Sequence, residues 1–153
     1  MFTSSPIQLS NYSAEAIVYD GTLIEAVKTE NGFNVKLSVW VNEQGELYID
    51  PKNKLLAGHI LSGENVYNAK TEFVGTVDKE SLTADIRKAL APAENLYYER
   101  CGTCHRAFDP VKYTNTRWLA VMQSMKSQAG LSEDEYKQIV RYQHILTYYE
   151  VSY

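Results

Sequence analysis

The stretch Cys101-Gly102-Thr103-Cys104-His105 contains both cysteines of this 153-residue chain. A histidine follows the second cysteine directly, so two thiols and an imidazole lie within five consecutive residues. Two cysteines this close together cannot form the disulfide framework of a small secreted domain. This stretch is therefore expected to decide how the chain around it folds.

Cys-x-x-Cys-His is the attachment pattern of c-type haem. On a helix, Cys101 and Cys104 would share a face, and each thiol could form a thioether to a vinyl group of one porphyrin. His105 is then expected to be the proximal iron ligand. Gly102 and Thr103 are small enough for the macrocycle edge to approach the backbone. The motif predicts one covalently bound haem c.

Two other interpretations of the motif stay open. A redox Cys-x-x-Cys is expected at the end of a strand in a βαβ unit, whereas polar residues of helical character, 95–100, precede Cys101. A structural zinc needs four ligands, and the chain offers only His59 and His144 as further nitrogen or sulfur donors. Tyr97, one helical turn before Cys101, is expected to pack on haem or on an opposing helix, which favours haem.

An electron carrier usually holds six-coordinate iron, and a methionine in the distal position raises the reduction potential. Met125, seven residues after Trp118 on the helix predicted after the motif, is the expected distal ligand. Met122 on the same helix is the second choice, and either methionine could instead be ordinary core. His144 is the third choice.

The composition is that of an ordinary globular protein, with 44% hydrophobic and 22% charged residues. The net charge of −4 argues against nucleic-acid binding, because a protein that neutralises phosphates needs a basic face. No stretch approaches the roughly 20 apolar residues of a spanning helix. The start of the chain lacks a charged and an apolar targeting region, so we expect a soluble chain from which a signal peptide or anchor has been removed.

The first half, residues 1–77, is predicted to be a small β-strand module. Apolar and polar residues alternate along 33–41, which is the period-2 pattern of a half-buried strand. Asn31-Gly32 predicts a two-residue hairpin turn, since both positions would need positive φ. Further strands are expected at residues 16–19, 23–27, 47–49, 55–61 and 73–77. Four to six short strands favour a small antiparallel barrel or curved sheet.

The second half, residues 78–153, is predicted to be a helical domain around the motif. Apolar residues recur at helical spacing from Leu82 onward. Thr116 is expected to cap one helix that Gly130 ends, and Ser132 with Glu135 forms a capping box that opens the last helix. The fold class expected is α+β: a small antiparallel barrel or curved sheet followed by a mostly α-helical haem domain.

Longer patterns carry a family resemblance. They are Gly21-Thr22-Leu23, Phe33-x-Val35-x-Leu37-x-Val39-Trp40-Val41 and Leu47-Tyr48 in the first half, and the cysteine motif, Arg117-Trp118-x-x-Val121-Met122-x-Ser124-Met125 and Leu131-Ser132-x-Asp134 in the second. The chain resembles monohaem cytochrome c domains, and specifically the C-terminal domain of the pentahaem cytochromes that pass electrons to periplasmic trimethylamine N-oxide reductase. The four-haem half of those proteins is absent, so this is either a fragment or a stand-alone relative.

The resemblance implies a periplasmic electron carrier of anaerobic respiration rather than an enzyme. Its expected partners are a quinol-oxidising multihaem cytochrome and a molybdenum-dependent S- or N-oxide reductase, with no nucleic acid and no membrane span in this chain. Two alternatives remain. The β module could be a docking domain with the haem as a relay, or the haem could be a ligand-binding sensor with an open sixth position.

Overall fold

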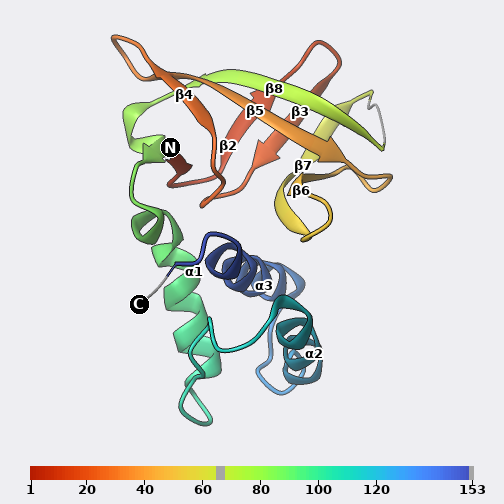
Figure 1. The fold of residues 1–153 in the computed structure, drawn as a ribbon, viewed down its shortest axis with the longest axis vertical. Coiled ribbons are helices and arrows are strands. Elements are labelled where there is room, and N and C mark those ends of the chain that lie inside the picture. Colours follow the sequence, from red (N-terminus) through yellow and green to blue (C-terminus); the bar gives the residue numbers. More distant parts are fainter. Residues whose placement is uncertain (65–67, 152–153) are drawn as a thin grey trace. The chain divides into compact units, whose positions relative to one another are not determined.

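The computed structural model describes residues 1–64 and 68–151 (Figure 1). The chain divides into two units, Met1–Leu90 and Ala91–Tyr153. The first unit is built of strands and the second of helices, and helix α1 (Ile86–Cys101) runs across the division. The functional modules expected at 1–77 and 78–153 stay a prediction, and residues 152–153 of the second lie outside the described residues.

Strands and helices both contribute largely to the described residues, which confirms the expected α+β class. The strands of the first unit are β1 (Phe2–Thr3), β2 (Ile7–Ser10), β3 (Ala14–Val18), β4 (Glu25–Lys28), β5 (Phe33–Val41), β6 (Glu46–Asp50), β7 (Leu55–Gly63), β8 (Ala69–Val77) and β9 (Leu82–Thr83), with the short helix η1 (Lys79–Ser81) before β9. The helices that follow α1 are α2 (Asn115–Met125) and α3 (Glu133–Tyr148).

A six-stranded antiparallel barrel forms the body of the first unit. Its strands follow the order β5–β6–β7–β3–β2–β8, and β8 closes the ring by pairing along the whole of β5. Closure gives each ring strand a neighbour on both sides, with β2 and β8 meeting at Ser10 and Val74. The sequence patterns missed β2, which joins β3 to β8, because four residues are too few for a clear alternation.

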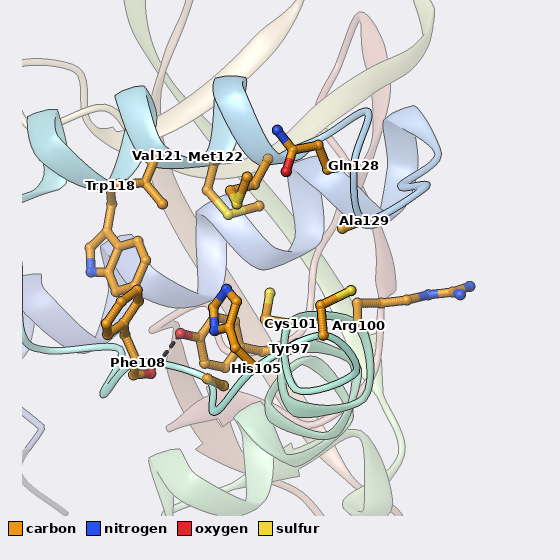
Figure 2. Close-up of a pocket in the computed structure, with 13 residues that line it drawn as sticks. Tyr97, Arg100, Cys101, His105, Phe108, Trp118, Val121, Met122, Gln128 and Ala129 are labelled. Atoms are coloured by element: carbon orange, nitrogen blue, oxygen red, sulfur yellow. Dashed lines mark hydrogen bonds between the residues drawn. The ribbon is translucent and has the colours of Figure 1, made fainter.

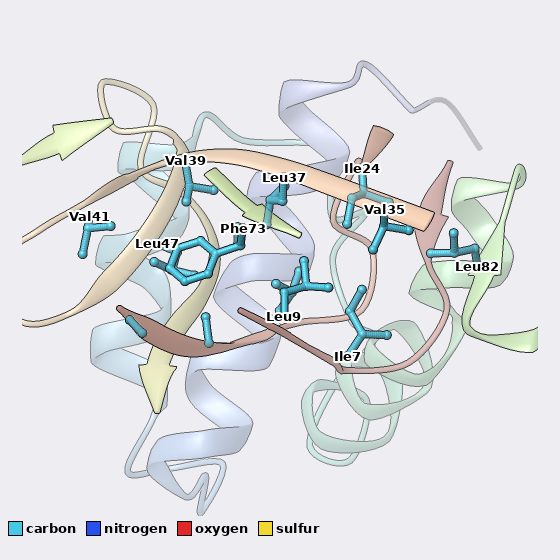
Figure 3. Close-up of a cluster of buried hydrophobic side chains, with 14 residues drawn as sticks. Ile7, Leu9, Ile24, Val35, Leu37, Val39, Val41, Leu47, Phe73 and Leu82 are labelled. Atoms are coloured by element: carbon cyan, nitrogen blue, oxygen red, sulfur yellow. The ribbon is translucent and has the colours of Figure 1, made fainter. Parts of the chain in front are cut away.

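The barrel interior is filled by the alternate residues of β5 and their neighbours. Val35, Leu37 and Val39 are at most 3% exposed, whereas Trp40 between them and Val41 is 42% exposed. The predicted period-2 pattern of this strand is therefore confirmed. Figure 3 shows Leu37 and Val39 of β5 in one cluster with Phe73 of β8, whose Cα pairs with that of Leu37.

Two local predictions for this unit are wrong. Asn31 and Gly32 do lie in the β4–β5 hairpin, but neither has positive φ. A Cβ at Gly32 would come within 2.1 Å of the Val77 carbonyl oxygen, so close approach of β8 is what requires glycine here. Leu82 does not begin a helical pattern. It lies in β9 and pairs with Thr3.

Side-chain caps begin the two helices that follow α1. Thr114, not Thr116, caps α2, because its Oγ1 accepts from the backbone N–H of Arg117. The predicted capping box of Ser132 and Glu135 is confirmed at the start of α3. Within the described residues, no helix combines the length and apolar character that crossing a membrane requires.

Candidate functional site

The end of α1 delivers the cysteine motif. Cys101 is the last residue of the helix, and Cys104 lies in the turn that follows it. Gly102 N–H donates to the Tyr98 carbonyl and Thr103 Oγ1 donates to the Glu99 carbonyl, at 2.9 and 2.7 Å. The expectation that both cysteines sit on one helix is therefore corrected. The turn, rather than helical spacing, brings the two thiols to the same side.

One pocket collects the expected site residues. Cys101, Cys104 and His105 line it from the α1 end, and Met122 and Met125 line it from α2. The enclosed space is about 110 Å³ and opens to solvent. In Figure 2, Val121 and Met122 of α2 lie across the pocket from Cys101 and His105. The other lining residues are Tyr97, Arg100, Ala107, Phe108, Trp118, Gln128 and Ala129.

The His105 imidazole is held in one tautomer. Its Nδ1 lies 2.9 Å from the backbone carbonyl oxygen of Arg106. A carbonyl can only accept, so Nδ1 donates, and in the neutral imidazole Nε2 is then the nitrogen with the lone pair that a metal would use. The ring also packs against Phe108, with centroids 5.8 Å apart. His105 is exposed, which leaves it accessible to a cofactor in the open part of the pocket.

The three candidates for a distal ligand differ in position. Met122 is 1% exposed and Met125 is partly exposed, and both line the pocket. His144 is buried in α3 and does not line it. Of these three side chains, the structure brings only the two methionines together with the motif.

The zinc and thiol-redox interpretations find little support in this geometry. Among the residues that the structure describes, no cluster of three or more His, Cys, Asp or Glu side chains could hold a metal ion. His59 lies on β7, with Nδ1 2.5 Å from the hydroxyl oxygen of Tyr19. Burial raises the pKa of the Cys101 thiol, and Cys101 ends a helix, whereas reactive thiols gain from a helix N-terminus that lowers their pKa.

Aromatic side chains form much of the pocket wall, as the spacing of Tyr97 predicts. The Tyr97 ring packs on Trp118 of α2 and Tyr142 of α3, with centroids 6.2 and 5.9 Å away. Burial is the largest cause that raises the pKa of Tyr97, which keeps its hydroxyl protonated as a donor. Sequence patterns missed Gln128 and Ala129, since they follow α2 in a turn without any recognisable spacing.

The pocket residues fit haem c. An apolar, aromatic-lined space is bordered by the donor groups that haem c needs. They are two thiols, an imidazole whose Nε2 can bind a metal, and two methionine sulfurs. This donor set matches thioether attachment with axial ligation by His and Met. The structure is that of a small helical domain arranged around a c-type haem motif.

Comparison with known proteins supports a cytochrome c region in the second half of the chain. Residues 97–150 match the model of the family described as Dihaem cytochrome c. The chain is also similar to the cytochrome c-type protein TorY of Haemophilus influenzae, with 30% identity over 66 residues. That match covers 43% of this chain and 18% of the relative's length. No solved structure matches the chain.

These similarities support covalently bound haem c and electron transfer as the general role of residues 97–150. The chain spans less than a fifth of the length of the relative it matches. The number of haems, the ligands and the redox partners are therefore taken up as proposals.

Proposed function

We propose that this chain is a periplasmic electron carrier that holds one haem c and passes single electrons to a terminal S- or N-oxide reductase. Cys101 and Cys104 would attach the haem, His105 would be the proximal ligand and Met125 the distal ligand. The observation that carries the proposal is the single pocket in which these side chains meet. The bound haem would supply a one-electron iron couple.

Each group of pocket residues has a distinct task in this proposal. The two cysteines fix the haem edge beside α1. His105 presents Nε2 because its Nδ1–H is engaged by the Arg106 carbonyl. Trp118 and Met122, at most 2% exposed, exclude water from the inner end of the pocket. A dry, fixed environment on one side lets iron change oxidation state with little rearrangement.

The sequence contains two cysteines, which is enough for the two thioether links of one haem. We therefore propose one haem for this chain, although the matching family is described as dihaem. The proposed partners are a quinol-oxidising multihaem cytochrome as donor and a molybdenum-dependent oxide reductase as acceptor. Exposed Phe108, at 42%, lines the pocket and marks the edge at which a partner would approach.

The test is an optical spectrum of the full chain matured in a host that attaches c-type haem. We expect a c-type pyridine haemochrome with one haem per chain and a one-electron redox titration. Cys101→Ala and Cys104→Ala should each leave one thioether, and the double variant should lose covalent haem. A wild-type protein without a c-type spectrum would contradict the proposal.

Delivery of electrons is a separate measurement. The reduced protein should be reoxidised by a purified molybdenum-dependent oxide reductase when its oxide substrate is added, and it should stay reduced when the oxide is omitted. A sensor with an open sixth position would instead be high-spin and bind carbon monoxide rapidly. That outcome would replace electron transfer as the function while leaving haem attachment intact.

A further inference from the structure

The segment of residues 106–110, which follows His105, forms no helix or strand, yet two buried side chains hold it. We propose that Tyr97 and Trp118 are positioning residues that clamp this segment and thereby fix the orientation of the His105 imidazole. The inference rests on the proposed role of His105 as proximal ligand. It adds to that function two residues that do not ligate iron.

The clamp consists of two hydrogen bonds to backbone carbonyls. The Tyr97 hydroxyl donates to the Phe108 carbonyl oxygen at 2.6 Å, drawn as a dashed line in Figure 2. The Trp118 indole Nε1–H donates to the Pro110 carbonyl oxygen, also at 2.6 Å. Tyr97 is 1% exposed and Trp118 is 2% exposed. Both donors are thus shielded from water, and loss of either would remove one anchor of the segment.

The segment's own hydrogen bonds begin only at its far end. Asp109 Oδ1 accepts from the Val111 N–H and the Asp109 carbonyl accepts from the Lys112 N–H, both at 3.0 Å. These bonds shape a turn at 109–112 but do not reach Arg106. The Arg106 carbonyl is the group that accepts from His105 Nδ1. The Phe108 carbonyl, which accepts from Tyr97, lies two residues after the Arg106 carbonyl. The Tyr97 hydrogen bond is thus the nearest anchor that follows the carbonyl bound by His105.

The two donors come from different helices. Tyr97 lies on α1 one turn before Cys101, and Trp118 lies on α2 one turn before Met122. Their rings meet edge to face, at 88° between planes. The clamp therefore links the segment to the helices that carry Cys101, Met122 and Met125. A shift of either helix would be transmitted to the backbone beside His105.

Tyr97→Phe is the sharpest test because it removes one oxygen and keeps the ring. The matched control is Tyr113→Phe. The Tyr113 ring also packs on Trp118, with ring centroids 5.2 Å apart. Its hydroxyl forms no hydrogen bond with any of the described residues. We expect the Val111 and Lys112 amides to exchange hydrogen about tenfold faster in Tyr97→Phe, the effect of losing a part-buried hydrogen bond of about 1.4 kcal/mol. α3 amides should be unchanged.

Trp118→Phe should act on the same two amides through the Pro110 carbonyl, with Trp40→Phe on the barrel as its control. Equal acceleration of α3 amides would indicate general destabilisation and overturn the clamp. Unchanged Val111 and Lys112 amides would also overturn it.

The second readout is the haem signature of the holoprotein. We expect the reduction potential and the low-spin ferric electron paramagnetic resonance g-values to shift in Tyr97→Phe and to keep wild-type values in Tyr113→Phe. Faster exchange with an unchanged haem signature would refute control of His105. A wild-type chain that binds no haem would refute the proposed function, and the exchange measurement would still decide whether the segment is clamped.

Discussion

At the scale of single residues, Gly102 illustrates how the motif is built. A Cβ at this position would lie 2.5 Å from the Tyr98 carbonyl oxygen, which the Gly102 N–H itself binds. The glycine is needed by the tight end of α1, which turns the chain toward Cys104. The interpretation that it makes room for a porphyrin edge is not required to explain it. The end of α1 alone accounts for this glycine.

The choice of distal ligand is also decided by single side chains. Met125→Ala should remove the weak far-red sulfur-to-iron band of the oxidised protein. It should also lower the reduction potential, because a thioether ligand favours Fe(II) and the variant lacks that ligand. Met122→Ala is the matched control on the same helix and should keep the band. Optical spectra with redox titration check both. The reverse pattern would assign Met122 as the distal ligand. Retention of the band in both variants would show that neither of these methionines is required as the ligand.

At the scale of elements, the start of α3 is joined to the end of α1 by one carboxylate. Glu135 accepts from the Ser132 backbone N–H at 2.9 Å and from Arg100 Nε at 3.0 Å. Arg100 precedes Cys101 directly. The capping box that begins α3 therefore also restrains the last turn of α1, where the motif starts.

Replacing Ser132 by Ala should cost about 1 kcal/mol of unfolding free energy, because the Glu135 N–H loses its capping acceptor. Ser127→Ala, in the turn before α3, removes an exposed hydroxyl without a cap and serves as the control. Denaturant unfolding followed by helical circular dichroism measures both. Equal stability of the two variants would contradict the cap's contribution.

The same carboxylate predicts a pH dependence. Hydrogen bonds from Ser132 and then Arg100 lower the pKa of Glu135 below its ordinary value of 4.5. A lowered folded pKa contributes stability that is complete above the unfolded value and is lost as pH falls through the folded pKa. Wild-type thermal stability should thus fall more steeply below pH 4.5 than that of Glu135→Gln. Parallel pH profiles of the wild type and Glu135→Gln would show that ionised Glu135 contributes nothing to thermal stability.

At the scale of the whole molecule, the two units have different kinds of interior. The barrel is filled by aliphatic side chains around Phe73, whereas Tyr97, Trp118 and Tyr142 form the buried aromatic centre of the helical unit. Aliphatic side chains fill a closed barrel from all strands. An aromatic wall with an open pocket instead suits a domain whose core is completed by a bound group.

Phe73→Ala should therefore destabilise the barrel by about 3–5 kcal/mol through loss of a fully buried ring. Val74→Ala, the next residue of β8 and 50% exposed, should change stability by no more than about 0.5 kcal/mol. Denaturant titrations that separate strand from helix signals measure the two variants. Similar losses in both would contradict the burial argument.

Local chemistry made part of this molecule predictable from sequence. The period-2 pattern of residues 33–41, the capping box at Ser132 and the α+β class depend on neighbours in the chain, and all three were confirmed. The c-haem interpretation also came from five consecutive residues, and the family match over 97–150 supports it. Spacing in the chain encodes such features because they involve residues a few positions apart.

Contacts between distant residues were decided by the tertiary structure alone. β2 completes the barrel by pairing Ser10 with Val74 of β8, far along the chain, and Gly32 is required by the Val77 carbonyl rather than by its own turn. The meeting of Cys101 and His105 with Met122 and Met125 in one pocket likewise depends on how α1 and α2 pack. The sequence by itself determined the haem motif and the local elements. Packing decided which side chains surround the motif, because burial and hydrogen-bond satisfaction are properties of the whole chain.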